Sequence, residues 1–99
     1  NLVVNAVDAI VETGGRITIE VHPNADATRV VCSVSDTGTG MATEVLERIF
    51  EPFFTTKPED RGTGLGLPVA REIVQSYGGK LEVSSRLGQG TKFTFDLPR

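Results

Sequence analysis

Three glycines occupy alternate positions in the run Gly62-Thr63-Gly64-Leu65-Gly66-Leu67, directly before an apolar segment with helical spacing. Because glycine has no Cβ, such a run lets the backbone come very close to a ligand. Pro68 falls in the first turn of the helix that we predict here, where a missing N–H costs little. The unpaired N–H groups and positive dipole end of that helix favour an anion, usually phosphate. Many glycine turns bind nothing, so the neighbouring motifs must decide.

Amide and carboxylate side chains form a stripe near the start of the chain. Asn1, Asn5, Asp8 and Glu12 recur at i, i+4, i+7 and i+11, which is one face of a helix. Asparagine prefers helix caps, so two on one stripe need a reason. One explanation is a solvated polar face. The other is a metal-facing stripe, because amide and carboxylate oxygens suit a hard cation such as Mg²⁺.

A carboxylate is also expected where the second strand ends. Val30, Cys32 and Val34 share one phase of residues 28–35, and Asp36 continues it on the core-facing side. A carboxylate there costs free energy unless it is hydrogen-bonded. It either bonds its own backbone in the turn that follows, which is common, or accepts from a ligand donor such as an exocyclic amine. Gly38 and Gly40 would let a flat ring approach it.

The segment from Phe50 to Gly64 has three phenylalanines and two prolines and no clear period. A long irregular segment in a compact domain is typical of a functional loop or lid, and the aromatic end can anchor it. Its cations Lys57 and Arg61 can reach phosphate oxygens. Alternatively, they are ordinary solvated loop charges.

The elements that must position these groups follow from hydrophobic spacing and from glycine and proline signals. The pattern predicts helices over 1–12, 43–49 and 65–77, strands over 16–22 and 28–35, and two further strands around Leu81-Val83 and Phe93-Leu97 joined by Gly88-Gln89-Gly90. Thr43 is the predicted N-cap of the helix over 43–49. This order favours an α/β (α+β) two-layer sandwich, with helices on one face of a mixed sheet and the site between the layers.

Two of these elements carry specific expectations about their faces. The strand over 16–22 places Ile17, Ile19 and Val21 on one side, which we expect to lie on a core. The helix over 65–77 places Leu65, Val69, Ile73 and Tyr77 on one stripe. His22, the only histidine, is best interpreted as a surface residue, and no zinc pattern is present.

Bulk composition limits the class of protein. The 99 residues are 38% hydrophobic and 23% charged, which fits one small globular domain. A net charge of -3 argues against duplex nucleic acid as the main partner. Cys32 is the only cysteine, so no internal disulfide forms, which fits a reducing compartment. Without a long apolar run or a signal peptide, we expect a soluble, cytoplasmic piece of a longer protein, whose parent can still be membrane-anchored.

Five motifs in order make the sequence resemble the catalytic ATP-binding domain of sensor histidine kinases, in the superfamily shared with gyrase B and MutL. The similarity covers nearly the whole chain, and its sequence of boxes is closest to the nitrogen-regulatory kinase subgroup. The motifs are the N box Asn1-Leu2-Val3-Val4-Asn5-Ala6, the first glycine box Asp36-Thr37-Gly38-Thr39-Gly40, the F box Ile49-Phe50-Glu51-Pro52-Phe53-Phe54, the second glycine box Gly62-Thr63-Gly64-Leu65-Gly66-Leu67, and the last box Gly88-Gln89-Gly90-Thr91.

The resemblance implies a fold of the Bergerat type, with an ATP lid over about residues 50–64 of one ATP-binding domain, 1–99. It implies that Asn5 binds Mg²⁺, that Asp36 accepts from the adenine amino group with help from Thr91, and that Lys57 lies near the terminal phosphates. Asn5 and Lys57 would be the catalytic residues. The implied nucleotide contacts are Asn1, Asn5, Asp36, Gly38, Gly40, Phe54, Lys57, Arg61, Gly62, Thr63, Gly64, Leu65, Gly66, Leu67 and Thr91.

The chain departs from the family pattern in two ways. Asp8 stands where many relatives carry a Lys or Arg, so phosphate neutralisation must rest more on Mg²⁺ and the lid. The phosphoaccepting histidine, and a strand and helix usually found before the N box, are absent from this sequence. The resemblance therefore implies phosphoryl transfer to a helical domain elsewhere in a dimeric parent protein, and then to a response regulator.

Two other functions remain open from the sequence. One is a clamp-type ATPase or a serine kinase resembling anti-sigma factors. Such an ATPase would need an acid one turn before the metal-binding Asn, where this chain has Asn1. The other is a non-catalytic nucleotide-binding or regulatory module, which the intact boxes disfavour.

Overall fold

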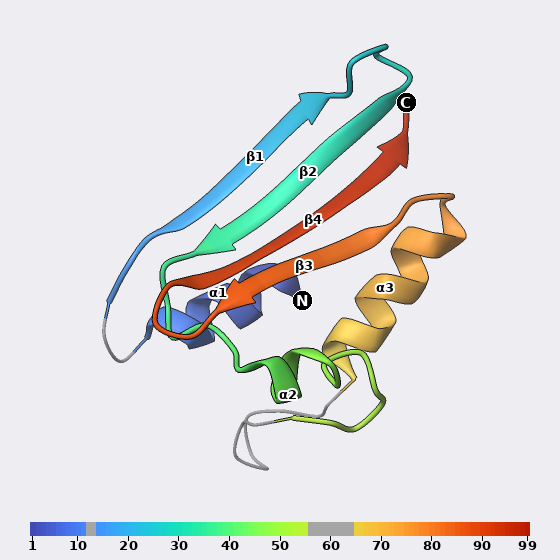
Figure 1. Cartoon of the computed structure of the whole chain (residues 1–99). Coiled ribbons are helices and arrows are strands. Elements are labelled where there is room, and N and C mark those ends of the chain that lie inside the picture. Colours follow the sequence, from blue (N-terminus) through green and yellow to red (C-terminus); the bar gives the residue numbers. More distant parts are fainter. Residues whose placement is uncertain (12–13, 56–64) are drawn as a thin grey trace.

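Alternating apolar and polar residues in four segments give a sheet, and amphipathic segments give helices that pack against it. The computed structural model describes residues 1–11, 14–55 and 65–99. The described elements, drawn in Figure 1, are α1 (Leu2–Ile10), β1 (Ile17–Pro23), β2 (Arg29–Asp36), α2 (Thr43–Leu46), α3 (Gly66–Ser76), β3 (Leu81–Arg86) and β4 (Gly90–Pro98).

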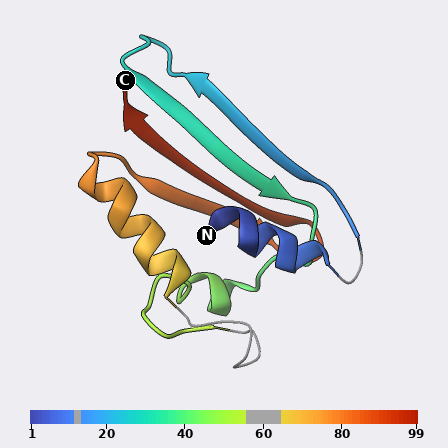
Figure 2. The ribbon, with the colours of Figure 1, turned by 180° about the vertical axis from the view of Figure 1, so that it is seen from behind.

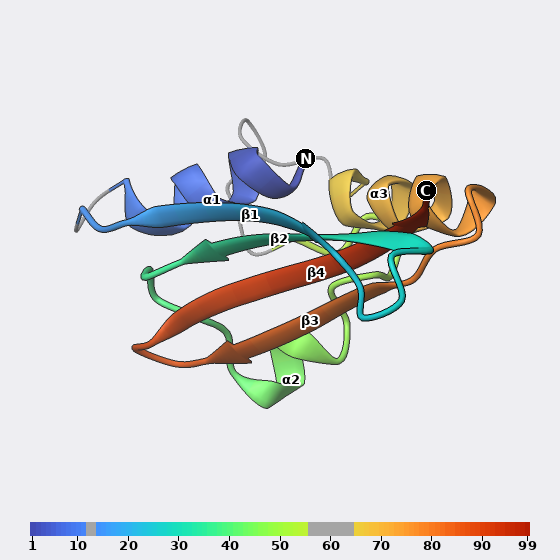
Figure 3. The same ribbon diagram turned by 90° about the horizontal axis from the view of Figure 1, so that it is seen from above.

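The four strands form one sheet in the order β1-β2-β4-β3. Every neighbouring pair is antiparallel, whereas we expected a mixed sheet. The reason lies in the hairpin that joins β3 and β4. β2 and β3 run in the same direction, and β4 lies between them, so they never pair directly. The expected two-layer arrangement is confirmed: α1 and α3 lie on one face of the sheet (Figures 2 and 3).

The core lies between α3 and the β3–β4 side of the sheet. Ile49, Val74, Leu81 and Phe93 form its buried cluster. Short α2 lies beyond the β3 edge (Figure 1), and its Val45 and Leu46 pack against this cluster. The chain segment after α2 is thereby attached to the same core as α3.

Strand β1 differs from expectation. Ile19 and Val21 are 59% and 64% exposed, so the predicted core-facing side of this strand is largely uncovered. The alternation is present, but β1 is an edge strand, and α1 packs over β2 instead. Sequence periodicity identifies the apolar side of a strand, and only the tertiary arrangement decides whether a helix covers it.

The apolar stripe of α3 also faces outward. Val69, Ile73 and Tyr77 share one side of the helix, as predicted, but all three are exposed. The side that packs on the core carries Val74 together with the half-buried Leu67 and Ala70. The stripe predicted from the sequence spacing is therefore not the one that packs on the core.

Helix ends agree with prediction to within three residues. α3 has Leu65 as N-cap and Tyr77 as C-cap, matching the predicted 65–77. α2 is shorter than the predicted 43–49, and its N-cap is Ala42 with extended φ and ψ, not Thr43. After α1, the Gly14 N–H donates to the Ile10 carbonyl at 2.7 Å, and Gly14 has a φ of 72°. This is the glycine-assisted helix end that the sequence indicated.

An ion pair fastens the C-terminal end of α3 to the sheet. Arg29 Nε lies 2.6 Å from Asp96 Oδ2, and Arg29 Nη2 donates to the Gly78 carbonyl at 2.7 Å. The Lys80 N–H donates to Asp96 Oδ1 at 2.9 Å. The hydrogen bond from the Lys80 N–H is the largest cause, and the one from Arg29 the second, of a pKa of Asp96 below its ordinary value of 3.8.

This pKa predicts an acid-dependent loss of stability. A carboxyl group whose pKa is lowered by folding stabilises the folded state above its unfolded pKa, and the contribution disappears as pH falls through the folded pKa. In urea titrations from pH 6 to pH 2.5, Asp96→Asn should be less stable than wild type at pH 6, and the difference should shrink below about pH 4. Two curves that stay parallel over this range would contradict the prediction.

Candidate functional site

Three polar side chains lie in one row on the helix-facing side of the sheet. Asp36 is directly opposite Thr91, and Thr91 is directly opposite Ser85, across β2, β4 and β3. Directly opposite side chains in antiparallel strands have their Cβ atoms about 4.5 to 5.5 Å apart. The ends of three strands thus present a carboxylate and two hydroxyls together at the edge of the apolar core.

The hydrogen bonding of Asp36 shows the turn interpretation and leaves room for a ligand. The Gly38 N–H donates to Asp36 Oδ1 at 2.9 Å, which is the common turn in which an aspartate bonds its own backbone. A carboxylate has two oxygens and about four lone-pair sites. One bond therefore leaves ample acceptor capacity for a ligand donor.

The first glycine box and the β3–β4 hairpin are locked together. The Gly88 N–H donates to the Thr39 carbonyl at 2.7 Å, and the Met41 N–H donates to Ser85 Oγ at 2.9 Å. A Cβ on Gly40 would lie 1.9 Å from the Arg86 carbonyl oxygen, at a φ of 69°. Segments about 50 positions apart in sequence thus meet in backbone contact that only glycine permits.

Two other glycines of these boxes, Gly38 and Gly90, also face protein atoms. A Cβ on Gly38 would lie 2.4 Å from the Ala9 carbonyl oxygen of α1, and one on Gly90 would lie 2.0 Å from the Asp36 carbonyl oxygen. We expected Gly38 and Gly40 to make room for a flat ring. In the structure, the absence of a side chain lets Gly38 pass close to α1 and Gly40 pass close to the hairpin. These contacts within the protein are enough to explain why glycine is needed at both positions.

The start of α1 lies beside the start of α3. A Cβ on Gly66 would be 3.6 Å from Asn1 Oδ1, so the first residue of the amide stripe lies beside the first residue of α3. Asn1 is the N-cap of α1 without a side-chain cap bond, and Asn5 is half-buried. The N-terminal N–H groups of α3 have no partner within the helix by geometry. This corner therefore combines amide oxygens with a positive helix end.

The F box is anchored by its first residues. Ile49 is buried in the core cluster, and Phe50 packs against it beneath the Arg71 guanidinium, 4.7 Å from the ring centre. Phe54, a predicted nucleotide contact, lies under Arg48 at 4.4 Å. Phe53 has a φ of 68° and is 74% exposed. Within the described residues, the start of this aromatic segment is therefore attached to the core, and Phe53 is left in solvent.

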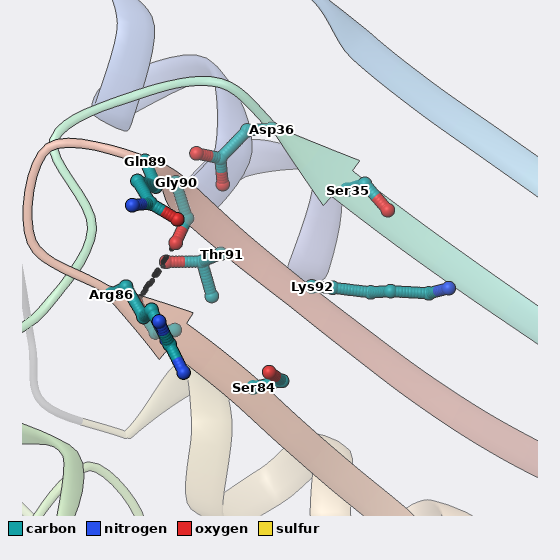
Figure 4. A pocket seen from close by; sticks show the side chains of 9 residues that line it. Ser35, Asp36, Ser84, Arg86, Gln89, Gly90, Thr91 and Lys92 are labelled. Atoms are coloured by element: carbon teal, nitrogen blue, oxygen red, sulfur yellow. Dashed lines mark hydrogen bonds between the residues drawn. The ribbon is translucent and has the colours of Figure 1, made fainter.

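A hollow of about 300 Å³ lies at the hairpin end of the sheet (Figure 4). Its lining includes the row of Asp36, Thr91 and Ser85. It also includes Ser35, Ser84 and Lys92, which form the neighbouring cross-strand row and by strand alternation belong to the opposite face. The hollow is thus largely an outer-face feature, distinct from the space between the sheet and the helices.

Several predicted contacts lie outside the described residues: Lys57, Arg61, Gly62, Thr63 and Gly64. Of the described ones, Leu67 packs on the core, and Leu65 is the N-cap of α3. Within 1–11, 14–55 and 65–99, no group of three or more His, Cys, Asp or Glu side chains is placed to hold a metal. The predicted metal ligand Asn5 is an amide and does not belong to that set.

Sequence reasoning missed Ser85. Its hydroxyl contacts Met41 N, the Gly90 carbonyl and Thr91 Oγ1, at 2.9, 3.1 and 2.8 Å. One signal was available in the sequence, since Ser85 shares the core-facing phase of Leu81 and Val83 just before the last glycine box. A hydroxyl in an apolar phase next to a functional loop indicates a specific partner.

Comparison with known proteins agrees with this geometry. The family model described as "Histidine kinase-, DNA gyrase B-, and HSP90-like ATPase" matches residues 1–99. The chain is 47% identical to the sensor kinase CckA of Brucella abortus over 112 residues, covering 100% of this chain and 12% of that protein. It is 46% identical to the sensor histidine kinase ZraS of Escherichia coli O157:H7 over 98 residues, covering 99% and 20%.

A solved structure, the nucleotide-free catalytic domain of histidine kinase ThkA, superposes with a TM-score of 0.79 at 40% identity, covering 98% of this chain and 60% of that one. The chain belongs to the family of histidine kinase-, DNA gyrase B- and HSP90-like ATPases. Within it, the chain is an ATP-binding catalytic domain of the histidine kinase type. It spans about a fifth or less of the curated relatives above. None of its described helices is long and apolar enough to span a membrane.

Proposed function

We propose that this domain binds Mg·ATP and presents the terminal phosphate to a histidine on a separate helical domain of a dimeric parent protein, which then phosphorylates an aspartate of a response regulator. The observation that carries the proposal is the cross-strand row headed by Asp36, which is held between the first and last glycine boxes, while Asn1 at the start of α1 lies beside the start of α3. We propose residues 1–99 as the ATP-binding unit, with the lid at about 50–64 and a cytoplasmic location.

At the base end, this interpretation assigns Asp36 to the adenine amino group. Its remaining lone pairs accept an N–H of the exocyclic amine, and Thr91 lies directly opposite as a second polar partner. Because Thr91 is only 8% exposed, its hydroxyl is held in a largely desolvated position, where hydrogen bonds discriminate strongly between ligands.

At the phosphate end, the N–H groups in the first turn of α3 and the amides of Asn1 and Asn5 face the polyphosphate. Glycine at position 66 keeps the space beside Asn1 open. The donor set fits Mg²⁺, since hard cations accept amide oxygens and keep several waters. When bound, Mg²⁺ neutralises charge on the phosphate oxygens. Lys57 and Arg61 would add positive charge from the lid.

Catalysis in this proposal is mainly positioning. The acceptor histidine supplies the nucleophile, while the domain fixes the nucleotide between Asp36 at one end and α3 at the other. The exposed ring of Phe53, at the entrance to the lid, suits contact with an apolar surface of the acceptor domain. The chain alone should therefore bind ATP but turn it over slowly.

Calorimetric titration of the 99-residue chain with a non-hydrolysable ATP analogue tests the proposal. We expect binding that strengthens when Mg²⁺ is added, and Asn5→Ala should lose about tenfold or more of that Mg²⁺-dependent gain. Without Mg²⁺, Asn5→Ala and wild type should differ far less, because the lost interaction runs through the metal.

Val4→Ala is the matched control, because Val4 is an exposed residue on the same helix. It should bind like wild type with and without Mg²⁺. Circular dichroism of every variant establishes that it is folded. A folded wild-type chain that does not bind the analogue, with the parent protein equally unable to bind, would refute the proposed function.

A further inference from the structure

We infer that Ser85 is a positioning residue for base specificity, which acts by holding the Thr91 hydroxyl as a hydrogen-bond acceptor beside Asp36. This inference rests on the proposed function, since it concerns the base end of the same site. Ser85 and Thr91 are opposite each other in β3 and β4, and Thr91 is opposite Asp36 in β2. Ser85 is too far along the row to be the primary partner of a base held by Asp36.

Hydrogen-bond accounting at Ser85 sets the direction of the network. A serine hydroxyl has one hydrogen and two lone pairs. The Met41 N–H occupies one lone pair at 2.9 Å. The two other contacts are the Gly90 carbonyl at 3.1 Å, which can only accept, and Thr91 Oγ1 at 2.8 Å, which can donate or accept.

All three contacts are hydrogen bonds in only one arrangement. Ser85 donates its hydrogen to the Gly90 carbonyl, and Thr91 donates its own hydrogen to the second lone pair of Ser85. Thr91 then has no hydrogen left and presents only lone pairs. If Ser85 donated to Thr91 instead, the Gly90 carbonyl would lose this hydrogen bond, so the arrangement above keeps one more hydrogen bond in a buried place.

Two neighbouring acceptors select for an amino group. Asp36 and Thr91 can both accept from the 6-amino group of a purine, which has two N–H donors. A 6-oxo purine places a carbonyl oxygen there and meets two acceptors, which is unfavourable. Without Ser85, the Thr91 hydroxyl can turn and donate to that carbonyl. Ser85 thus excludes 6-oxo purines without touching the base.

The test compares non-hydrolysable analogues of ATP and inosine triphosphate by calorimetry, using the 99-residue chain with Mg²⁺. Wild type should prefer the adenine nucleotide. In Ser85→Ala the ratio of the two dissociation constants should fall by about five- to tenfold, mainly through tighter inosine binding. Ser85→Thr keeps the hydroxyl and should restore the wild-type ratio.

Ser84→Ala is the matched control, because Ser84 is the adjacent serine on the opposite, exposed face of β3. It should leave both affinities unchanged. If Ser85→Ala does not fold, Ser85→Cys keeps the side-chain volume with a much weaker donor and should lower the ratio in the same direction.

An unchanged ratio in a folded Ser85 variant, or an equal loss of both nucleotides, would overturn the inference while leaving the proposed function standing. Failure of the folded wild type to bind either nucleotide would overturn both. The two failures are therefore distinguishable in one set of titrations.

Discussion

Asp36→Asn should weaken binding of an ATP analogue roughly 10- to 100-fold, the range expected for one lost charge-assisted hydrogen bond. The fold should persist, because an asparagine oxygen can still accept from the Gly38 N–H, the turn bond that Asp36 makes at 2.9 Å. The substitution replaces the other carboxylate oxygen with an NH₂ group, and this donor would then face the amino group of the base, which is also a donor. Calorimetry with and without Mg²⁺ measures the effect.

Asp26→Asn provides a matched control for this experiment. Asp26 makes the same kind of turn, since Asp26 Oδ1 accepts from the Thr28 N–H at 3.1 Å, but it lies in the β1–β2 turn at the opposite end of the sheet. It should bind the nucleotide like wild type. Wild-type affinity in a folded Asp36→Asn variant would remove Asp36 from the base site.

Gly40→Ala should destabilise the fold by roughly 3 kcal/mol or more and abolish nucleotide binding at temperatures where wild type is folded. Alanine at a φ of 69° costs about 1–2 kcal/mol in any environment. Here its Cβ would also lie 1.9 Å from the Arg86 carbonyl oxygen, so the hairpin must move away from the loop. That movement would separate Ser85 from Met41 and disturb the row that contains Asp36.

Gly88→Ala separates these two costs. Gly88 has a φ of 77°, but a Cβ there would meet nothing within 4 Å. The free energy of unfolding of Gly88→Ala should therefore fall only by the backbone penalty, about 1 kcal/mol, and nucleotide binding should be retained. Urea denaturation gives both values. Equal destabilisation of the two variants would show that the loop and hairpin do not need the close approach at Gly40.

The sequence by itself determined most of the local elements and the positions of the candidate site residues within them. Strand alternation placed Asp36 on the core-facing side, and the glycine boxes indicated where the backbone turns closely. The helix predicted over 65–77 is observed over Gly66–Ser76, because its apolar period, proline and double glycine all agree. These features depend on residues close in sequence, which is the range over which pattern and propensity operate.

Only the tertiary structure decided which apolar faces are covered and which loops touch. Ile19 and Val21 have the spacing of a core strand, yet β1 is an edge strand and no described helix lies over them. Likewise, the exposed stripe of α3 is as apolar as a core stripe. Burial depends on where other elements pack, and periodicity within one element carries no information about that.

The role that we infer for Ser85 also depends on the tertiary structure. Its three partners lie on two other segments, and the position of β4 between β2 and β3 is what brings Thr91 between Ser85 and Asp36. Sequence spacing located the carboxylate and the glycine boxes of this site. The direction of the hydrogen bonds that join them follows from strand order and backbone contact, which are set by the whole fold.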